Sequence, residues 1–165
     1  MYYGYAILAV LLILGDQLTK LAVRTGIPLG GSIPFIPGIL DLTYVQNTGA
    51  AFSLLRQHTW LLTLTSALVV LVMCALIVKG FFQNALGRWA AALVLAGGVG
   101  NLIDRALFGF VTDMLQTVFM DFPVFNVADV CVVSGALLAA VYYLWFYEKY
   151  DKRGGPHGDA DAAAR

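Results

Sequence analysis

Charged residues are scarce in this chain: they make up 12% of it, whereas hydrophobic residues make up 60% and the mean hydropathy is +0.80. This composition excludes an ordinary water-soluble domain and predicts a membrane protein. Neither sign of charge is in excess, because 10 Lys and Arg residues balance 10 Asp and Glu residues. A nucleic-acid partner, which would require a basic surface, is therefore not expected.

Histidine is nearly absent, and the pattern H-E-x-x-H does not occur, so a zinc protease is not expected. Serine catalysis lacks a base, because neither His58 nor His157 lies in a predicted span with Ser134. The Gly-x-Gly-Asp signature of intramembrane diaspartyl proteases is also missing, since Asn101 follows Gly100. No metal and no cofactor are expected.

Cysteine is equally rare, and Cys74 and Cys131 fall in different predicted spans. A disulfide between them would have to join two helices within the lipid. Both are therefore predicted to be buried, small apolar residues.

Four apolar runs are long enough to cross a hydrocarbon core of roughly 30 Å. They predict a mainly α membrane protein with transmembrane helices at residues 5–24, 60–79, 88–106 and 127–147. The first run does not read as a cleavable signal peptide, because no basic residue precedes it and Asp16 and Lys20 interrupt it.

Basic residues indicate the orientation of these spans. Lys79 and Arg88 flank the short turn between the second and third spans, and further basic residues follow the fourth. By the positive-inside rule, this turn and both termini are predicted to be cytoplasmic. The long loops 25–59 and 107–126 would then be extracytoplasmic. Residues 1–150 would form one transmembrane domain, and residues 151–165 a disordered cytoplasmic tail.

The first long loop changes character along its length. Glycines and prolines between residues 26 and 38 exclude a continuous helix. Leu40, Leu42 and Tyr44 then alternate with polar or smaller neighbours, which predicts a strand. The extracytoplasmic region is therefore expected to contain a small strand, followed by a turn at Asn47.

Residues 108–129 carry three carboxylates, with no Lys, Arg or His among them. If two carboxylates meet in a poorly hydrated site, both cannot stay ionised, so one keeps a proton while the other can act as a base. Asp113 with Asp129 is the preferred pair, and Asp121 is a competitor on composition alone. A solvated loop or cap carboxylate is the alternative for each of them.

Other polar residues interrupt the spans near the same predicted membrane face. Asp16 and Lys20 are four residues apart and share a helix face, either as an ion pair or as support for a polar site. Asn101 and Arg105 have the same spacing, as a functional cluster or as a helix end with a snorkelling Arg. The glycines of the stretch 97–100 permit close helix packing.

Four motif blocks follow one another along the chain: Asp16-Gln17-x-Thr19-Lys20, Asn47-Thr48-Gly49-Ala50-Ala51-Phe52, Gly100-Asn101-Leu102-Ile103-Asp104-Arg105, and Val111-x-Asp113 with Phe125-Asn126-Val127-Ala128-Asp129. Together they resemble the successive motifs of bacterial lipoprotein signal peptidase, or signal peptidase II, over roughly residues 5–148. The resemblance implies an aspartic endopeptidase of the bacterial cytoplasmic membrane, with its active site near the extracytoplasmic face. It also implies cleavage of prolipoprotein signal peptides on the amino side of a diacylglyceryl-modified Cys.

The same resemblance assigns roles to individual residues. It implies a catalytic dyad of Asp113 and Asp129, with Asp121 outside it. Substrate positioning or support of the dyad is implied for Asn47, Gly49, Asn101, Arg105 and Asn126. An architectural role is implied for Asp16, Lys20 and Asp104. Thr112 and Met114 depart from the aliphatic and aromatic residues expected on either side of Asp113.

The expected partners are lipid-modified prolipoprotein signal peptides and membrane lipid, with the protein working as a monomer. Residues 26–56 are predicted to close as a flap over the bound peptide. Two other functional classes use membrane carboxylates. A small transporter would carry acidic residues near mid-span, whereas here they gather at one rim. A noncatalytic scaffold would bind lipid-modified partners without cleaving them.

Overall fold

The computed structural model describes residues 3–49, 59–82 and 84–146. Within these ranges, four helices have the length and hydropathy of membrane spans. They are α1 (Tyr3–Gly26), α2 (Thr59–Val78), α3 (Ala85–Phe108) and α4 (Val127–Val141), which continues into a π-helical turn (Tyr142–Phe146). Three strands, β1 (Ser32–Ile36), β2 (Leu40–Asn47) and β3 (Val111–Thr117), form one antiparallel sheet. The predicted fold class is confirmed.

Some predictions concern residues outside the described ranges. The disordered tail 151–165 is one of them, and Ala50-Ala51-Phe52 of the second motif block is another.

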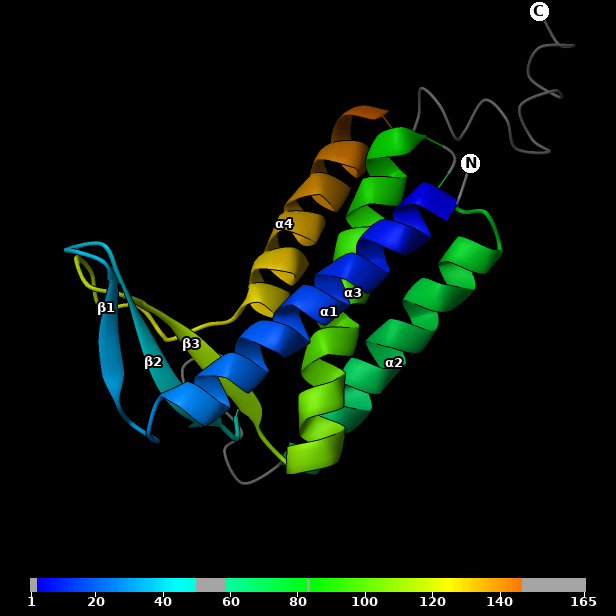
Figure 1. Cartoon of the computed structure of the whole chain (residues 1–165). Helices are drawn as coiled ribbons and strands as arrows, with labels where there is room; N and C mark the ends of the chain where they lie inside the picture. Colours follow the sequence, from blue (N-terminus) through cyan, green and yellow to red (C-terminus); the bar gives the residue numbers. More distant parts are fainter. Residues whose placement is uncertain (1–2, 50–58, 83, 147–165) are drawn as a thin grey trace, which may run out of the picture.

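Helix α3 lies at the centre of the bundle and packs against α1, α2 and α4 (Figure 1). The approach of α4 is close, because Gly97 lies against the carbonyl of Ala128 and leaves no room for a Cβ. Gly100 lies against α1 in the same way, since an added Cβ would stand 2.7 Å from Oδ2 of Asp16. The close packing predicted from the glycine-rich stretch is therefore confirmed at these two positions.

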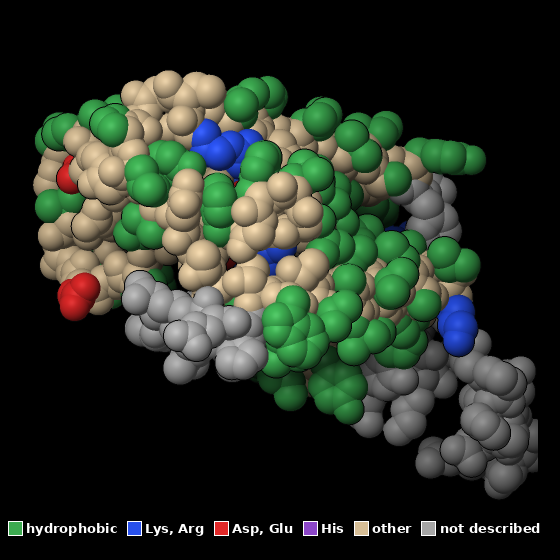
Figure 2. Space-filling model, turned by 90° about the horizontal axis from the view of Figure 1, so that it is seen from below, with side chains coloured by type: hydrophobic (Ala, Val, Ile, Leu, Met, Phe, Trp, Pro, Cys, Tyr) green, Lys and Arg blue, Asp and Glu red, His purple; other side chains and the backbone are tan. Residues whose placement is uncertain are grey.

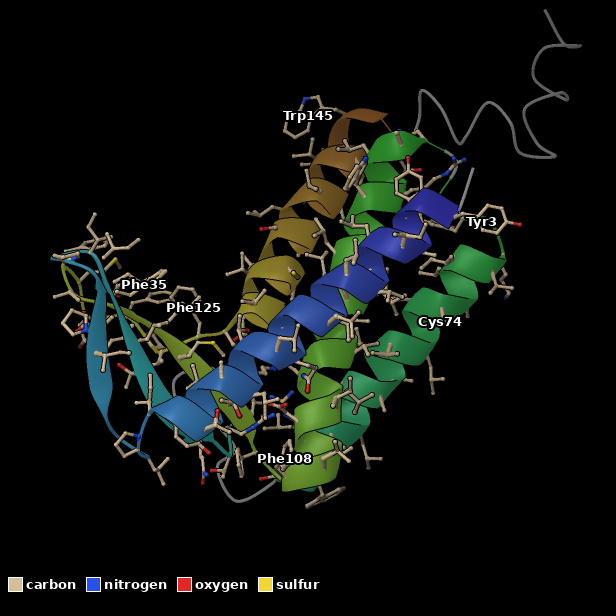
Figure 3. All side chains as sticks on the ribbon, viewed as in Figure 1. Tyr3, Phe35, Cys74, Phe108, Phe125 and Trp145 are labelled. Atoms are coloured by element: carbon tan, nitrogen blue, oxygen red, sulfur yellow. The ribbon has the colours of Figure 1, made fainter. Side chains whose placement is uncertain are left out.

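Helix α2 contributes no buried residue to the bundle and is the most hydropathic of the four helices. A helix that is apolar all round and covered on only one side faces lipid. Cys74 lies on this helix and is exposed (Figure 3). Cys131 of α4 is buried. The prediction of burial was therefore wrong for Cys74, because a Cys facing lipid needs no packing partner.

The sheet projects sideways from the end of the bundle where α1 and α3 end and α2 begins (Figure 1). Seen from below, hydrophobic side chains cover the helices, and the acidic side chains in view lie toward the sheet (Figure 2). Buried Val23 and Ile27 at the end of α1 pack against Tyr44 of β2 and Met114 of β3. This apolar cluster fastens the sheet to the bundle.

The strand order is β1-β2-β3, so β2 lies in the middle. The predicted strand at residues 40–45 is confirmed as β2. Strand β1, which contains Pro34, is an exposed edge strand, and edge strands tolerate proline. Strand β3 pairs Asp113 with Val45 and Thr112 with Gln46. Neither β1 nor β3 was predicted, and β3 places the first of the two key carboxylates on a strand.

Candidate active site

Asp129 lies in the first turn of α4, where Asn126 is the N-cap residue. Oδ1 of Asn126 accepts a hydrogen bond from the backbone N–H of Asp129 at 2.9 Å, and the carboxylate of Asp129 accepts one from the backbone N–H of Asn126 at 3.2 Å. This reciprocal capping box satisfies two N–H groups that the helix cannot pair internally. It also fixes the Asp129 carboxylate at the rim of the membrane helix.

Asp113 is held by two amide side chains from different parts of the chain. Nδ2 of Asn126 donates to its Oδ1 at 2.7 Å, and Nδ2 of Asn47 donates to its Oδ2 at 2.8 Å. Asn47 is itself oriented, because its Oδ1 accepts from the backbone N–H of Gly49 at 2.9 Å. Both predicted carboxylates therefore contact the same residue, Asp113 through the side chain of Asn126 and Asp129 through its backbone N–H.

The environment of Asp113 raises the pKa of its carboxyl to about 6. Burial is the main cause, because it disfavours the charged form, and the nearby charge of Asp129 acts in the same direction. The hydrogen bonds from Asn47 and Asn126, and the more distant charge of Lys20, oppose the rise. Asp113 can therefore gain or lose a proton near neutral pH.

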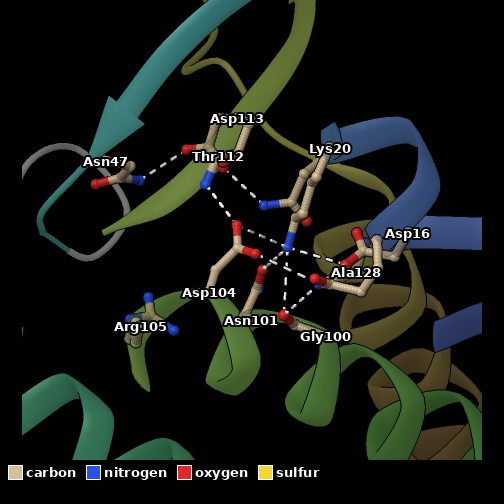
Figure 4. A network of polar contacts seen from close by, with 12 residues as sticks. Asp16, Lys20, Asn47, Gly100, Asn101, Asp104, Arg105, Thr112, Asp113 and Ala128 are labelled. Atoms are coloured by element: carbon tan, nitrogen blue, oxygen red, sulfur yellow. Dashed lines mark hydrogen bonds and ion pairs between the residues drawn. The ribbon is translucent and has the colours of Figure 1, made fainter. Parts of the chain in front are cut away.

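A second chain of contacts runs from Asp129 to α1. Nδ2 of Asn101 donates to Oδ1 of Asp129 at 2.7 Å. Nζ of Lys20 donates to Oδ1 of Asn101 at 2.9 Å (Figure 4). Lys20 is completely buried and forms ion pairs with Asp16 at 2.9 Å and with Asp104 at 3.5 Å. The predicted ion pair of Asp16 and Lys20 is confirmed, and it lies beside the polar site as well.

Asp16 and Asp104, for which the resemblance implies an architectural role, also join helices and sheet. Oδ1 of Asp16 accepts a hydrogen bond from the backbone N–H of Ala128 at 2.9 Å, which ties the first turn of α4 to α1. Oδ2 of Asp104 accepts one from the backbone N–H of Thr112 at 2.8 Å, which ties β3 to α3 (Figure 4). Both carboxylates thus connect elements that carry Asp113 or Asp129.

Three contributors to this network were not predicted as site residues: Gln17, Arg24 and Thr112. Nε2 of Gln17 donates to the carbonyl of Gly100 at 3.0 Å. Nη1 of Arg24 donates to Oγ1 of Thr112 at 3.0 Å and lies 3.4 Å from Oδ1 of Asp104. The signal for Arg24 was its spacing, because residues 16, 20 and 24 lie on one helix face.

The network has two halves that differ in their partners. The cation-paired half consists of Asp16, Lys20, Arg24 and Asp104. The amide-held half consists of Asn47, Asn101, Asp113, Asn126 and Asp129. Asn101 links them through Lys20.

Arg105 stands beside this network and not within its hydrogen bonds (Figure 4). Its Nη1 donates to Oγ of Ser66 on α2 at 3.2 Å, and its buried Nε has no hydrogen-bond partner among the described residues. Its charge interacts with those of Asp129 and Asp113. Arg105 lines a cavity of about 490 Å³ between α2 and α3, whose other lining residues are Thr59, Trp60, Thr63, Leu64, Ala106 and Gly109.

Asp121 is exposed in the irregular segment after β3 and makes no hydrogen bond or ion pair with Asp113 or Asp129 in the described part of the chain. Composition alone left Asp121 as a competitor for the pair. Asp113 and Asp129, by contrast, both form hydrogen bonds with Asn126.

Known proteins match this chain over nearly all of its length. The family model of signal peptidase (SPase) II matches residues 8–145. A lipoprotein signal peptidase of Streptococcus pyogenes serotype M2 is 40% identical over 141 residues, covering 86% of this chain and 92% of the relative. One of Enterococcus faecalis is 40% identical over 150 residues, covering 91% and 92%.

Solved structures agree with these relatives. A bacterial membrane enzyme determined by the in meso method at 2.3 Å resolution superposes with a TM-score of 0.80 and 29% identity, covering 92% of this chain and 93% of its own. A second, at 1.9 Å resolution, has a TM-score of 0.79 and 30% identity, covering 87% and 94%. On the extent of the family match and the identity to its relatives, the chain belongs to the signal peptidase II family, the aspartic-type lipoprotein signal peptidases.

Proposed function

We propose that Asp113 and Asp129 are the catalytic dyad of this aspartic-type peptidase and that they activate a water molecule. The family cleaves the signal peptides of prolipoproteins. For this chain, the proposed substrate is a prolipoprotein whose Cys carries a diacylglyceryl group, cut on the amino side of that Cys. The observation that carries the proposal is that Asn126 contacts both carboxylates: its side-chain amide donates to Asp113, and its backbone N–H donates to Asp129.

In the proposed reaction the two carboxyls share one proton. Asp129 is the ionised partner, since the helix N-terminus and the N–H of Asn126 favour negative charge there. It takes a proton from the water as the water oxygen bonds to the scissile carbonyl carbon. Asp113, with its raised pKa, donates its proton to the amide nitrogen as the C–N bond breaks. The pair titrates as a unit.

Arg105 supplies the positive charge in this scheme. Arg105 lines the cavity between α2 and α3, and its buried Nε is without a hydrogen-bond partner among the described residues. A guanidinium N–H in that position would hold a carbonyl oxygen of the substrate and stabilise negative charge developing on it. The lipid tails of the substrate would remain in the bilayer while the peptide bond reaches the polar rim.

The orientation and the flap remain parts of the proposal. We place the active site at the extracytoplasmic face of the bacterial cytoplasmic membrane, because Lys79 and Arg88 lie at the opposite end of the bundle. Strand β1, an exposed edge, would close with β2 over the bound peptide. Spin-label distances across the cavity that stay unchanged on substrate binding would overturn the flap.

The test uses purified protein and a diacylglyceryl-modified prolipoprotein. Asp113→Asn and Asp129→Asn should each abolish cleavage while the thermal unfolding transition shows that the variants fold. Asp41→Asn on β2, outside the network, is the matched control and should cleave like the wild type. Cleavage retained by either dyad variant would overturn the proposal, and binding without any cleavage by the wild type would favour a scaffold.

A further inference from the structure

We propose that Arg24 is a positioning residue for Asp113 and that it acts through Thr112, the neighbouring residue on β3. This inference rests on the proposed function, because it concerns the proposed catalytic role of Asp113. Its starting point is that Thr112 is a fully buried polar side chain on a strand that carries a key carboxylate.

The pleat of β3 divides its side chains between two directions. Met114 packs against Val23 at the end of α1, and the hydroxyl of Thr112 contacts Arg24 one residue further along that helix. Successive side chains of a strand point to opposite faces. Thr112 and Met114 therefore anchor β3 on α1, while Asp113 between them points toward Asn47 and Asn126.

Arg24 holds Thr112 from more than one side. Its Nη1 donates to Oγ1 of Thr112 at 3.0 Å and lies 3.4 Å from Asp104, which accepts the backbone N–H of Thr112 at 2.8 Å. The guanidinium carbon stands 4.5 Å from the ring centre of Phe108 on α3, within the range of a cation–π contact. Side chain and backbone of Thr112 are thus fixed by one arginine–aspartate pair.

The contact between Arg24 and Thr112 fixes the position of Asp113 relative to the amides of Asn47 and Asn126. The two hydrogen bonds of Asp113, at 2.7 and 2.8 Å, leave little freedom for the strand to slide or roll. Because Thr112 and Asp113 are consecutive, a shift of the first moves the carboxylate of the second. Small displacements of a reacting group lower the rate of the chemical step strongly. Arg24 does not line the cavity beside Arg105, so its loss should act on kcat and leave KM nearly unchanged.

The two partners are not equivalent when one of them is removed. In Arg24→Met, the buried hydroxyl of Thr112 loses its one hydrogen-bond partner among the described residues. In Thr112→Val, Arg24 keeps Asp104 and can still reach water, since 16% of its side chain is exposed. The double variant contains neither the stranded hydroxyl nor the arginine, and an apolar pair can pack at that contact.

The experiment measures kcat and KM for cleavage of a diacylglyceryl-modified prolipoprotein by the full-length protein. Arg24→Met should lower kcat about tenfold with KM changed less than about twofold, and Thr112→Val should lower kcat only about twofold. Thr112→Val added to Arg24→Met should raise kcat again, because Arg24 is proposed to act through Thr112 and the double variant has no stranded hydroxyl. Arg24→Lys, which keeps the charge, should recover part of the loss.

The pH dependence of kcat gives a second readout. The charged groups that face Asp113 are Asp129 from α4, Lys20 from α1 and Arg105 from α3, and Arg24→Met leaves all three in place. Loosening the hydrogen bonds of Asn47 and Asn126 to Asp113 would raise the pKa of Asp113. The part of the kcat–pH profile that depends on the ionisation of Asp113 should therefore move to higher pH in Arg24→Met.

Thr25→Val is the matched control, because Thr25 is exposed and its hydroxyl bonds only carbonyls of its own helix. It should keep the wild-type kcat and pH profile. A wild-type kcat in Arg24→Met, or a double variant no faster than Arg24→Met, would overturn the positioning role and leave the proposed dyad standing. If Arg24→Met does not fold, Arg24→Lys with and without Thr112→Val takes its place under the same criteria. Cleavage by Asp113→Asn would instead overturn the proposed function itself.

Discussion

The two halves of the polar network contain the same acidic residue type in opposite electrostatic settings. In the cation-paired half, Asp16 and Asp104 contact the buried ammonium of Lys20. In the amide-held half, the carboxylates of Asp113 and Asp129 accept hydrogen bonds from neutral asparagine side chains. The four buried or partly buried carboxylates therefore form two pairs, one in contact with a cation and the other in contact with neutral amides.

The difference in partners accounts for a difference in what each carboxylate can do. A buried ammonium and the carboxylates beside it depend on one another, because removing either charge leaves the other uncompensated. An amide satisfies a carboxylate oxygen without supplying a full charge, so burial can still raise the pKa, as it does at Asp113. Pairing with a cation therefore suits a carboxylate that holds elements of the fold together, whereas hydrogen bonds from amides leave a carboxyl able to exchange a proton.

The largest expected effect comes from breaking the cation-paired half. Lys20→Met leaves Asp16 and Asp104 without their shared ammonium in a fully buried position. Removing one partner of a buried ion pair costs about 3–5 kcal/mol, a large part of the total stability of a domain. Denaturant unfolding in detergent micelles, followed by circular dichroism, measures this loss.

The matched control for Lys20 is Lys79→Met, at an exposed position just after α2. Its effect should stay within about 0.5 kcal/mol, as for most surface substitutions. Equal stability of Lys20→Met and Lys79→Met would show that Lys20 does not stabilise the network.

The next effect concerns the pH dependence of stability in the amide-held half. Folding raises the pKa of Asp113 from its ordinary value of 3.8 to about 6, so the folded protein prefers the protonated carboxyl. This contribution is complete below pH 3.8 and is lost as pH rises through about 6. It amounts to about 3 kcal/mol at most.

Asp113→Asn cannot titrate at this position and should lack the decline. Unfolding free energies of the wild type and Asp113→Asn should be measured in parallel from pH 3.5 to 7.5. The wild type should lose stability relative to the variant between about pH 4 and 6. Parallel curves across that range would contradict the raised pKa.

A smaller effect is expected from comparing two helix N-cap residues, one that also contacts the proposed dyad and one that does not. Asn126 caps α4 and bonds Asp113, whereas Asn84 caps α3 by accepting the N–H of Gly87 at 2.8 Å. Replacing either residue by Ala removes an N-cap and should cost about 1 kcal/mol of stability. Only Asn126→Ala should also lower kcat, by about tenfold, which corresponds to about 1.4 kcal/mol.

Cleavage kinetics and unfolding of the two cap variants test this pair together. If Asn84→Ala lowered kcat as much as Asn126→Ala, the loss would come from general destabilisation, and the amide of Asn126 would have no separate role at Asp113.

The sequence predicted the features that depend on local pattern. The spans follow from long apolar runs, and β2 follows from the alternation that begins at Leu40. Strand β3 was missed because Val111, Thr112, Asp113 and Met114 are all buried, so no alternation of polar and apolar residues marks it. Strand β1 was missed because all of its residues are exposed and one is a proline.

The site shows the same division between local and distant information. Asp16 and Lys20 could be paired from their spacing within one helix. The contact of Arg24 with Thr112 joins residues 88 positions apart, and no local pattern contains it. Arg24 was not predicted as a site residue, although its place on the face of Asp16 and Lys20 was visible in the sequence.

The smallest expected effect is at Asp121, the third carboxylate of the stretch that contains the dyad. It is exposed in the irregular segment after β3, so it is solvated and contributes to neither half of the network. Asp121→Asn should change the unfolding free energy by less than about 0.5 kcal/mol and leave kcat and KM unchanged. Because Asp113→Asn makes the same chemical change eight positions earlier, the two variants assayed side by side isolate the effect of environment. A loss of cleavage in Asp121→Asn would mean that exposure and partners do not decide which carboxylate works.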